Sequence, residues 1–235
     1  MRSLVIHLLR ATARAENVSR LLGQLPDAEI VEAVDGRDPA QISGTVQVNG
    51  THHHPPYPFS LNTAEVACFL SHRKCWQMIA EGNDPYALVA EDDTVIDPVP
   101  FAAALDLVRR YANEESFIRL PAKPRERAAG AIARQGGAAL FLPKTIGLQA
   151  VCQVVGRSAA RRLLDVSAVI DRPVDTTLQM HWVTGQKVHT ILPSGISETG
   201  GASTIQHKTR TGELFMREVR RASYRAKIRR RPQTP

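Results

Sequence analysis

The chain has 235 residues, of which 43% are hydrophobic and 23% charged, and this length and composition suit one well-buried domain of a globular enzyme. No stretch reaches the roughly 18 apolar residues of a membrane-spanning helix, and residues 1–14 do not resemble a secretory signal. Three unpatterned cysteines argue against a disulfide framework. We therefore expect a cytoplasmic protein. The net charge of +7 is concentrated in residues 208–231, where ten Lys or Arg stand against two Glu; the remaining 20 basic and 21 acidic residues argue against a nucleic-acid partner for the body of the protein.

Hydrophobic patterning predicts strands that alternate with helices along the chain. The clearest helix, 62–80, begins at Asn62 with Glu65 three residues later, which is the pattern of a capping box. Such alternation predicts an α/β domain over 1–207 with a mostly parallel, Rossmann-like sheet and helices on both faces, followed by a basic C-terminal tail over 208–235. The expected strands are 3–9, 29–34, 86–90, 117–120, 138–142, 149–155 and 187–192, and the expected helices are about 13–22, 62–80, from 97 onward, 158–164 with Ser158 as its cap, and 212–231.

Three consecutive carboxylates, Glu91, Asp92 and Asp93, follow the predicted strand 86–90. Ligands of open α/β sheets bind beyond the carboxyl ends of the strands, and carboxylate oxygens suit Mg²⁺ or Mn²⁺ that is also held by substrate phosphates. The triplet equally fits a solvated acidic turn ahead of the next helix, so both interpretations stay open on these residues alone.

One stripe of the predicted helix 62–80 carries Glu65, Cys68, His72 and Trp76, at about 100° per residue. A half-buried Glu and His must pair with each other or face a site. The stripe therefore predicts either a structural Glu65–His72 pair or a ligand site next to the acidic triplet.

The stretch NTAEVACFLSH over residues 62–72, then Trp76, and then an apolar strand into the triplet closely resemble glycosyltransferase family 25. That family includes bacterial lipopolysaccharide or lipooligosaccharide galactosyltransferases and the collagen galactosyltransferases. Further similar segments bring the resemblance to most of residues 3–206: these are 5–8 (VIHL) with Arg14, 33–36 (AVDG), 147–164 and 173–175 (PVD). The departures are His7 in place of Asn, Ala64 and Ala67 in place of Gly, and a loose match over 203–206; none of them removes a carboxylate.

The resemblance implies an inverting transferase of the GT-A type that moves a hexose from a UDP-sugar, with UDP-galactose the expected donor, onto a cell-surface glycan such as lipopolysaccharide. Asp93 is the expected ligand of Mn²⁺ or Mg²⁺, and Glu91 or Asp92 would contact the ribose or orient metal-bound water. Asp35 could meet the uridine, and Arg14 could contact the diphosphate or only anchor the first helix. The expected supporting residues are Glu65, Ser71 and His72.

Inversion in one displacement needs a carboxylate that takes the proton of the attacking hydroxyl. The resemblance points to Asp175 as this base, whereas its position equally fits an N-cap for a helix that begins near Thr176. In many enzymes of the GT-A fold a C-terminal histidine completes the metal shell. His207 is placed to do so, and His181 and His189 are its competitors.

The basic tail is predicted to form a helix with a narrow apolar stripe of Phe215, Val219, Ala222 and Ala226. Basic amphipathic helices favour anionic membrane surfaces, where a lipid-linked acceptor would be found, so we expect a protein at the periphery of the inner membrane. RNA contact and a disordered solubilising tail are the alternatives. The alternative functions are a non-catalytic relative that binds sugar nucleotides or acts as a scaffold, and a transferase that uses another UDP-sugar.

Overall fold

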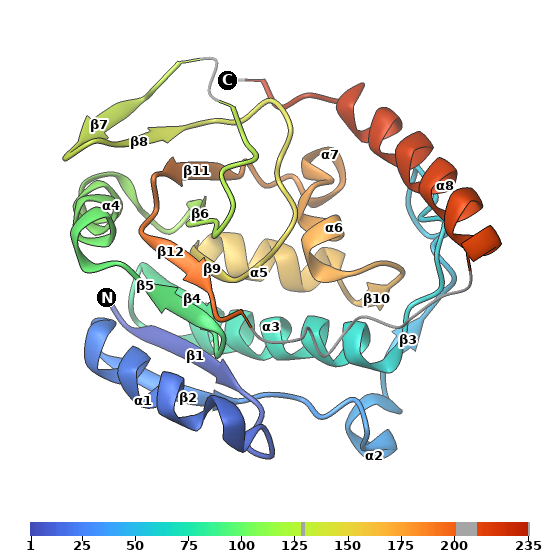
Figure 1. Cartoon of the computed structure of the whole chain (residues 1–235), viewed down its shortest axis with the longest axis horizontal. Coiled ribbons are helices and arrows are strands. Elements are labelled where there is room, and N and C mark those ends of the chain that lie inside the picture. Colours follow the sequence, from blue (N-terminus) through green and yellow to red (C-terminus); the bar gives the residue numbers. More distant parts are fainter. Residues whose placement is uncertain (128–129, 201–210, 235) are drawn as a thin grey trace.

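The computed structural model describes residues 1–127, 130–200 and 211–234. An eight-stranded sheet runs through the molecule in the order β2-β1-β4-β9-β6-β11-β8-β7 (Figure 1). Its strands are β1 (Ser3–His7), β2 (Ala28–Glu32), β4 (Tyr86–Glu91), β6 (Phe117–Arg119), β7 (Ala133–Gln135), β8 (Ala138–Phe141), β9 (Cys152–Gly156) and β11 (His189–Leu192).

The sheet is mixed, which corrects the expectation of a mostly parallel one. β1 is parallel to β2 and β4, and β6 is parallel to β11, whereas β9 runs antiparallel to both β4 and β6. β8 is antiparallel to β11 and β7. A parallel neighbour needs a crossover connection, usually a helix. β9 instead enters the sheet from β8 through the helix-free segment 142–151, so nothing in that connection requires it to run parallel to its neighbours.

Helices cover both faces of the sheet, as expected. α3 (Thr63–Glu81) and α5 (Arg157–Val166) pack on one face around the buried Trp76. α1 (Ala15–Gln24) and α4 (Pro98–Tyr111) cover the opposite face. Each face therefore has its own hydrophobic core, and the central strands are buried between the two.

The helix starts follow local chemistry. The capping box of α3 is confirmed: Glu65 N donates to Asn62 Oδ1 and Asn62 N donates to Glu65 Oε2, both at 2.9 Å. Asp97 caps α4, with Pro98 in its first turn. The predicted cap of α5 was wrong, because β9 runs directly into that helix through Gly156 and Ser158 lies inside the first turn.

Most of the short elements were not predicted, because two to five residues are too few to show a period. The exception is 174–178, since a helix that begins near Thr176 was one of the two interpretations of Asp175. Two of the short elements, β5 and β12, pair with each other next to the acidic triplet, and β3 pairs with β10. Their bounds are η1 (Thr12–Arg14), α2 (Pro39–Ile42), β3 (Val46–Gln47), β5 (Thr94–Ile96), β10 (Val169–Ile170), α6 (Val174–Leu178), α7 (His181–Thr184) and β12 (Ile196–Glu198).

The tail forms helix α8 (Thr211–Arg229), which lies against the body beside α6 and α7 (Figure 1). Tyr224 and Ile228 are buried in this contact. The predicted apolar stripe faces away, since Phe215 is 71% exposed and Val219 46% exposed. Helix α8 thus docks through one face and leaves a second apolar face uncovered. No helix in the described parts of the chain is long and apolar enough to span a membrane.

Candidate active site

The acidic triplet lies where β4 ends, with Glu91 as the last residue of that strand. Asp92 is 5% exposed and both of its carboxylate oxygens have protein partners. Its Oδ2 lies 2.8 Å from His7 Nδ1, and its Oδ1 accepts a hydrogen bond from Arg14. Asp92 therefore holds the turn against the end of β1 and the residues just before α1, and both of its carboxylate oxygens are engaged in these contacts. The contact of Arg14 supports an anchoring role for this arginine.

Asp93 differs, because one of its oxygens is unused. Oδ2 lies 3.2 Å from Arg14 Nη2, whereas Oδ1 is buried without a hydrogen-bond partner among the described residues. Burial, and then the charge of Glu91, raise the pKa of Asp93 to about 6. A buried carboxylate oxygen without a donor is costly. Since further carboxylates lie nearby, the residues here fit a divalent cation.

Glu91 connects the triplet to the stripe on α3. Its Oε1 lies 3.0 Å from Nε2 of His72, so His72 pairs with Glu91 and not with Glu65. The other ring nitrogen of His72, Nδ1, lies 3.1 Å from Nε2 of Gln153 on β9. Cys68 is one turn earlier on α3, and the ligand atoms of Cys68, His72 and Glu91 all lie within 4.8 Å of one another. The structure thus brings the stripe and the triplet together.

Asp175 faces the same space. Its Oδ2 accepts a hydrogen bond from the backbone N–H of Gln149 at 3.0 Å. The residue lies inside the first turn of α6, so it does not cap that helix, and the N-cap interpretation is wrong. Burial raises the pKa of the Cys68 thiol, and the charges of Glu91 and Asp175 both add to this effect. The candidate base and the triplet therefore both lie close enough to this thiol to affect its pKa.

Gln149 was missed in the sequence and has an unusual backbone. Its φ of 82° lies in the left-handed region, which residues other than glycine rarely adopt and which recurs at functional sites. Arg119 Nη2 donates to the carbonyl oxygens of Leu148 and Gln149 at 2.7 and 2.8 Å. The Gln149 side chain donates to Glu198 Oε1 at 2.9 Å. This loop is therefore braced between Asp175 and a further carboxylate.

Glu198 is the further carboxylate beside Gln149, and no sequence motif marked it as a site residue. It lies on β12, which pairs with β5 so that Glu198 is opposite Thr94, next to Asp93. Its charge contributes to the raised pKa of Asp93. Lys123 Nζ lies 2.8 Å from its Oε2. A residue more than a hundred positions from the triplet is brought beside it only by this short strand pair.

The other predicted residues have mostly local partners. Asp35 pairs with Arg10, with Oδ1 2.9 Å from Nη2, and this hydrogen-bonded pair lowers the pKa of Asp35 to about 2. Ser71 Oγ accepts from the backbone N–H of Val34 and ties α3 to the end of β2. Burial, and then Asp175, raise the pKa of Glu65, although its contact with the Asn62 N–H opposes the change.

The histidines proposed to complete a metal shell do not join the carboxylates in the described parts of the chain. His207 lies outside the described residues. His181 Nε2 lies 3.0 Å from the carbonyl oxygen of Arg231. His189 lines a separate cavity with Tyr111 and Lys187.

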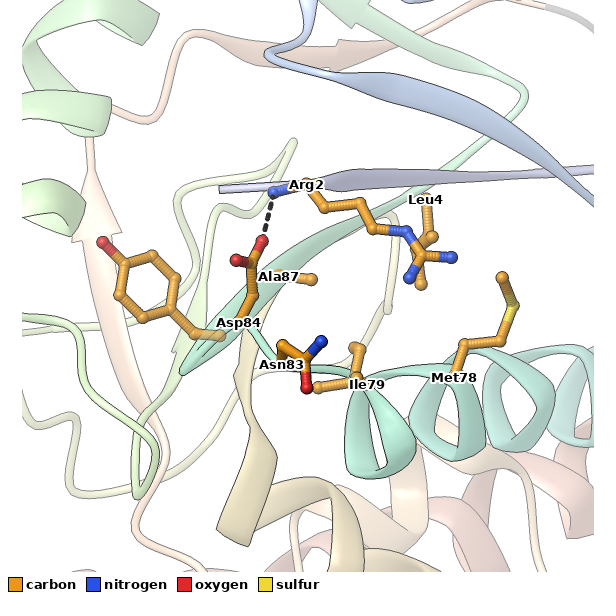
Figure 2. A pocket seen from close by; sticks show the side chains of 9 residues that line it. Arg2, Leu4, Met78, Ile79, Asn83, Asp84 and Ala87 are labelled. Carbon is orange, nitrogen blue, oxygen red and sulfur yellow. Dashed lines mark hydrogen bonds between the residues drawn. The ribbon is translucent and has the colours of Figure 1, made fainter.

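A second cavity, of about 220 Å³, lies at the opposite end of β4 from the triplet (Figure 2). Asp84 at its rim accepts a hydrogen bond from the backbone N–H of Arg2 at 3.2 Å, and much of the lining is apolar, including Leu4, Met78 and Ile79. With its one carboxylate already bonded, this cavity has no part in the proposed chemistry.

Comparison with known proteins identifies the family. The family model described as glycosyltransferase family 25 (LPS biosynthesis protein) matches residues 1–129, which are more than half of the chain and include the triplet and the α3 stripe. A Drosophila melanogaster protein named "Glycosyltransferase 25 family member" is 26% identical over 120 residues. This match covers 49% of the present chain and 20% of the fly protein, so the chain spans about a fifth of that relative's length.

Among solved structures, 2-C-methyl-D-erythritol 4-phosphate cytidylyltransferase from Thermus thermophilus aligns over 93% of this chain and 98% of its own. The identity is 14% and the TM-score 0.34, a likeness too weak to carry an argument. The family match rests on the N-terminal half, where the ordered motifs of α3 and β4 lie. By that match, the chain belongs to glycosyltransferase family 25.

Proposed function

We propose that this glycosyltransferase is an inverting, metal-dependent hexosyltransferase of the GT-A type. The observation that carries the proposal is that Gln149 bonds to both Asp175 and Glu198, beside the Asp93 carboxylate whose Oδ1 is buried and unpartnered among the described residues. The resemblance of the motifs to the family favours UDP-galactose as donor and a cell-surface glycan such as lipopolysaccharide as acceptor.

Asp93 is the proposed metal ligand. Its Oδ1 is buried and unpartnered among the described residues, and the charges of Glu91 and Glu198 act on its carboxylate. Carboxylate oxygens are ligands that suit Mn²⁺ or Mg²⁺. A divalent cation held there would neutralise charge on the departing diphosphate. Asp92 and Arg14 support the site indirectly, because their mutual contact holds the turn that carries Asp93.

Asp175 is the proposed general base. The Gln149 N–H holds one oxygen of the Asp175 carboxylate in place. The carboxylate takes the proton of the acceptor hydroxyl while the oxygen of that hydroxyl bonds to the anomeric carbon. The bond from the anomeric carbon to the diphosphate breaks on the opposite side, which inverts the configuration. Asp35, beyond the end of β2, remains our proposal for a contact with uridine.

Helix α8 supports a position at an anionic membrane surface. Its exposed face carries Phe215, Met216 and Val219, and the helix is rich in arginine. Apolar side chains beside basic ones favour binding at the interface of an anionic bilayer. A lipid-linked acceptor at the inner membrane would then be close to the site.

The test is a screen of the full chain for turnover of UDP-sugars with Mn²⁺, with Mg²⁺ and in excess chelator. We expect one UDP-hexose to be turned over, with activity lost in chelator and restored by added metal. Full activity in chelator would exclude the metal dependence. Binding of a UDP-sugar without any turnover, with and without acceptor glycans, would favour the non-catalytic relative.

A further inference from the structure

We infer that Cys68, His72 and Glu91 form a binding site for a thiophilic divalent cation, with Zn²⁺ the best fit. Cys68 and His72 are four residues apart on α3 and share one face of that helix. The end of β4 brings Glu91 to the same point. This donor set lies beside the proposed Mn²⁺ or Mg²⁺ site but has a different chemistry.

The distances suit zinc. His72 Nε2 and Glu91 Oε1 are 3.0 Å apart, and the three ligand atoms lie within 4.8 Å of one another. Ligand atoms about 2.0–2.3 Å from a tetrahedral zinc are themselves roughly 3.3–3.6 Å apart. The sulfur lies within 4.8 Å of both partners, so rotation of the Cys68 side chain would bring it into tetrahedral range.

The ligand types also favour zinc. A thiolate, an imidazole and a carboxylate are the three groups that zinc sites use, whereas a thiolate is not a ligand that suits Mg²⁺ or Mn²⁺. Three protein ligands leave the fourth position of a tetrahedral zinc open to water or to another ligand. Cys68 is half-buried and the Glu91 side chain is 27% exposed, so a cation can enter from solvent.

Gln153 supplies an independent observation. Its side chain is fully buried, and its Oε1 has no hydrogen-bond partner within the described ranges. Its Nε2 lies 3.1 Å from Nδ1 of His72. Without metal, the imidazole therefore donates from Nε2 to Glu91 and accepts at Nδ1.

Metal binding would change which atom of Gln153 contacts His72. When His72 Nε2 becomes a ligand, the imidazole proton must move to Nδ1, and the Cys68 thiol must lose its proton to solvent. Rotation of the Gln153 amide by half a turn then places Oε1 to accept the Nδ1–H bond. Metal-ligating histidines usually have such a buried partner, which fixes the tautomer and the orientation of the ring.

The test measures binding to the full chain without sugar nucleotide, by Zn²⁺ competition against a chromogenic chelator and by the absorption spectrum with Co²⁺. We expect a near-ultraviolet thiolate-to-cobalt band that saturates at one cation per chain at this site. Cys68→Ser should remove the band and weaken Zn²⁺ binding at least tenfold. Gln153→Leu should keep the band and weaken binding by about 10- to 100-fold, as for other partners of metal-binding histidines.

Cys75→Ser is the matched control, because Cys75 lies on the same helix but outside the cluster. It should leave the cobalt band and the Zn²⁺ affinity unchanged. Absence of the band from the unmutated chain would overturn the proposal, as would unchanged affinity in Cys68→Ser or loss of the band in Cys75→Ser. The histidine run 52–54 can bind metal but cannot produce a thiolate band.

A consequence rests on the proposed function. Because the zinc site uses Glu91, we expect Zn²⁺ to inhibit sugar transfer and Cys68→Ser to relieve that inhibition. Binding is measured without turnover, so the zinc site can hold if the transferase proposal fails. Conversely, sugar transfer by a chain that does not bind Zn²⁺ would overturn the zinc site but not the proposed transferase activity.

Discussion

Two clusters of buried charge in this protein differ in how fully their polar atoms are paired. Around Arg172, the guanidinium donates to both oxygens of Asp171, to the carbonyl oxygens of His53 and Pro55, and to the Tyr224 hydroxyl. This cluster joins the loop before α3, the start of α6 and helix α8.

In the cluster at the end of β4, by comparison, some buried polar atoms have no hydrogen-bond partner among the described residues. Within the described parts of the chain, Asp93 Oδ1 and Gln153 Oε1 are buried and unpaired. Buried polar atoms are nearly always satisfied, so those that are not call for a ligand or a functional reason. The contrast agrees with a structural role for Arg172 and with the binding role that we propose for the end of β4.

The largest effect is expected for Asp93→Asn, which should reduce sugar transfer to background while the protein stays folded. The change removes the charge that would hold the cation but keeps the size of the side chain. Turnover and circular dichroism, with and without Mn²⁺, would check this. Asp106→Asn, on the exposed side of α4, is the control and should leave turnover unchanged. Normal turnover in Asp93→Asn would remove the metal assignment.

Arg172→Met should lower the free energy of unfolding by about 3–5 kcal/mol, because it removes the ion-pair partner of the buried Asp171 carboxylate. Arg20→Met breaks an exposed pair with Glu16 and should cost less than about 1 kcal/mol. Denaturant unfolding of both variants measures the difference. Equal stability of the two would contradict the structural role of the Arg172 cluster.

Asp175→Asn should reduce turnover by about 10²-fold or more, as expected for loss of a general base, while donor binding changes little. The Gln149 N–H can still donate to the amide oxygen, so the loop should keep its shape. Turnover and UDP-sugar binding, measured separately, distinguish a base from a binding residue. Weaker donor binding at unchanged turnover would contradict the assignment.

The raised pKa of Asp93 predicts a pH-dependent stability in metal-free buffer. Folding raises this pKa from an ordinary 3.8 to about 6, so the folded state binds the proton more tightly and loses stability as the pH rises through this window. Asp93→Asn should therefore be the more stable protein at pH 7, and the difference should vanish below about pH 4. Melting curves across this range provide the measurement. A constant difference would mean that Asp93 does not titrate as described.

The smallest effects concern the two faces of α8. Phe215→Ser with Val219→Ser should weaken binding to anionic vesicles without changing stability, because both side chains are exposed. Tyr224→Ala, on the docked face, should instead lower stability and leave the exposed apolar face intact. Cosedimentation at low and high salt, with neutral vesicles as control, measures the vesicle binding of both variants, and melting curves measure their stability. Unchanged binding in the double variant would exclude this face as the membrane contact.

The sequence by itself determined the features that depend on neighbouring residues. The capping box of α3, the four-residue spacing of Cys68 and His72, and the placement of the triplet after a buried strand each arise within one helix or one strand end. Helices on both faces also followed from the pattern, because each amphipathic helix must bury its apolar side against the sheet.

Only the tertiary structure decided the direction of β9 and the partners of the triplet. Strand direction depends on how a connection crosses the sheet, and the segment before β9 has no periodic pattern to reveal it. His7 and Arg14 both contact the Asp92 carboxylate. A three-residue strand places Glu198 beside Asp93, and Arg119 donates to the carbonyl oxygen of Gln149, whose backbone is left-handed. These contacts join residues far apart in the chain, so they exist only after the sheet has brought its strand ends together.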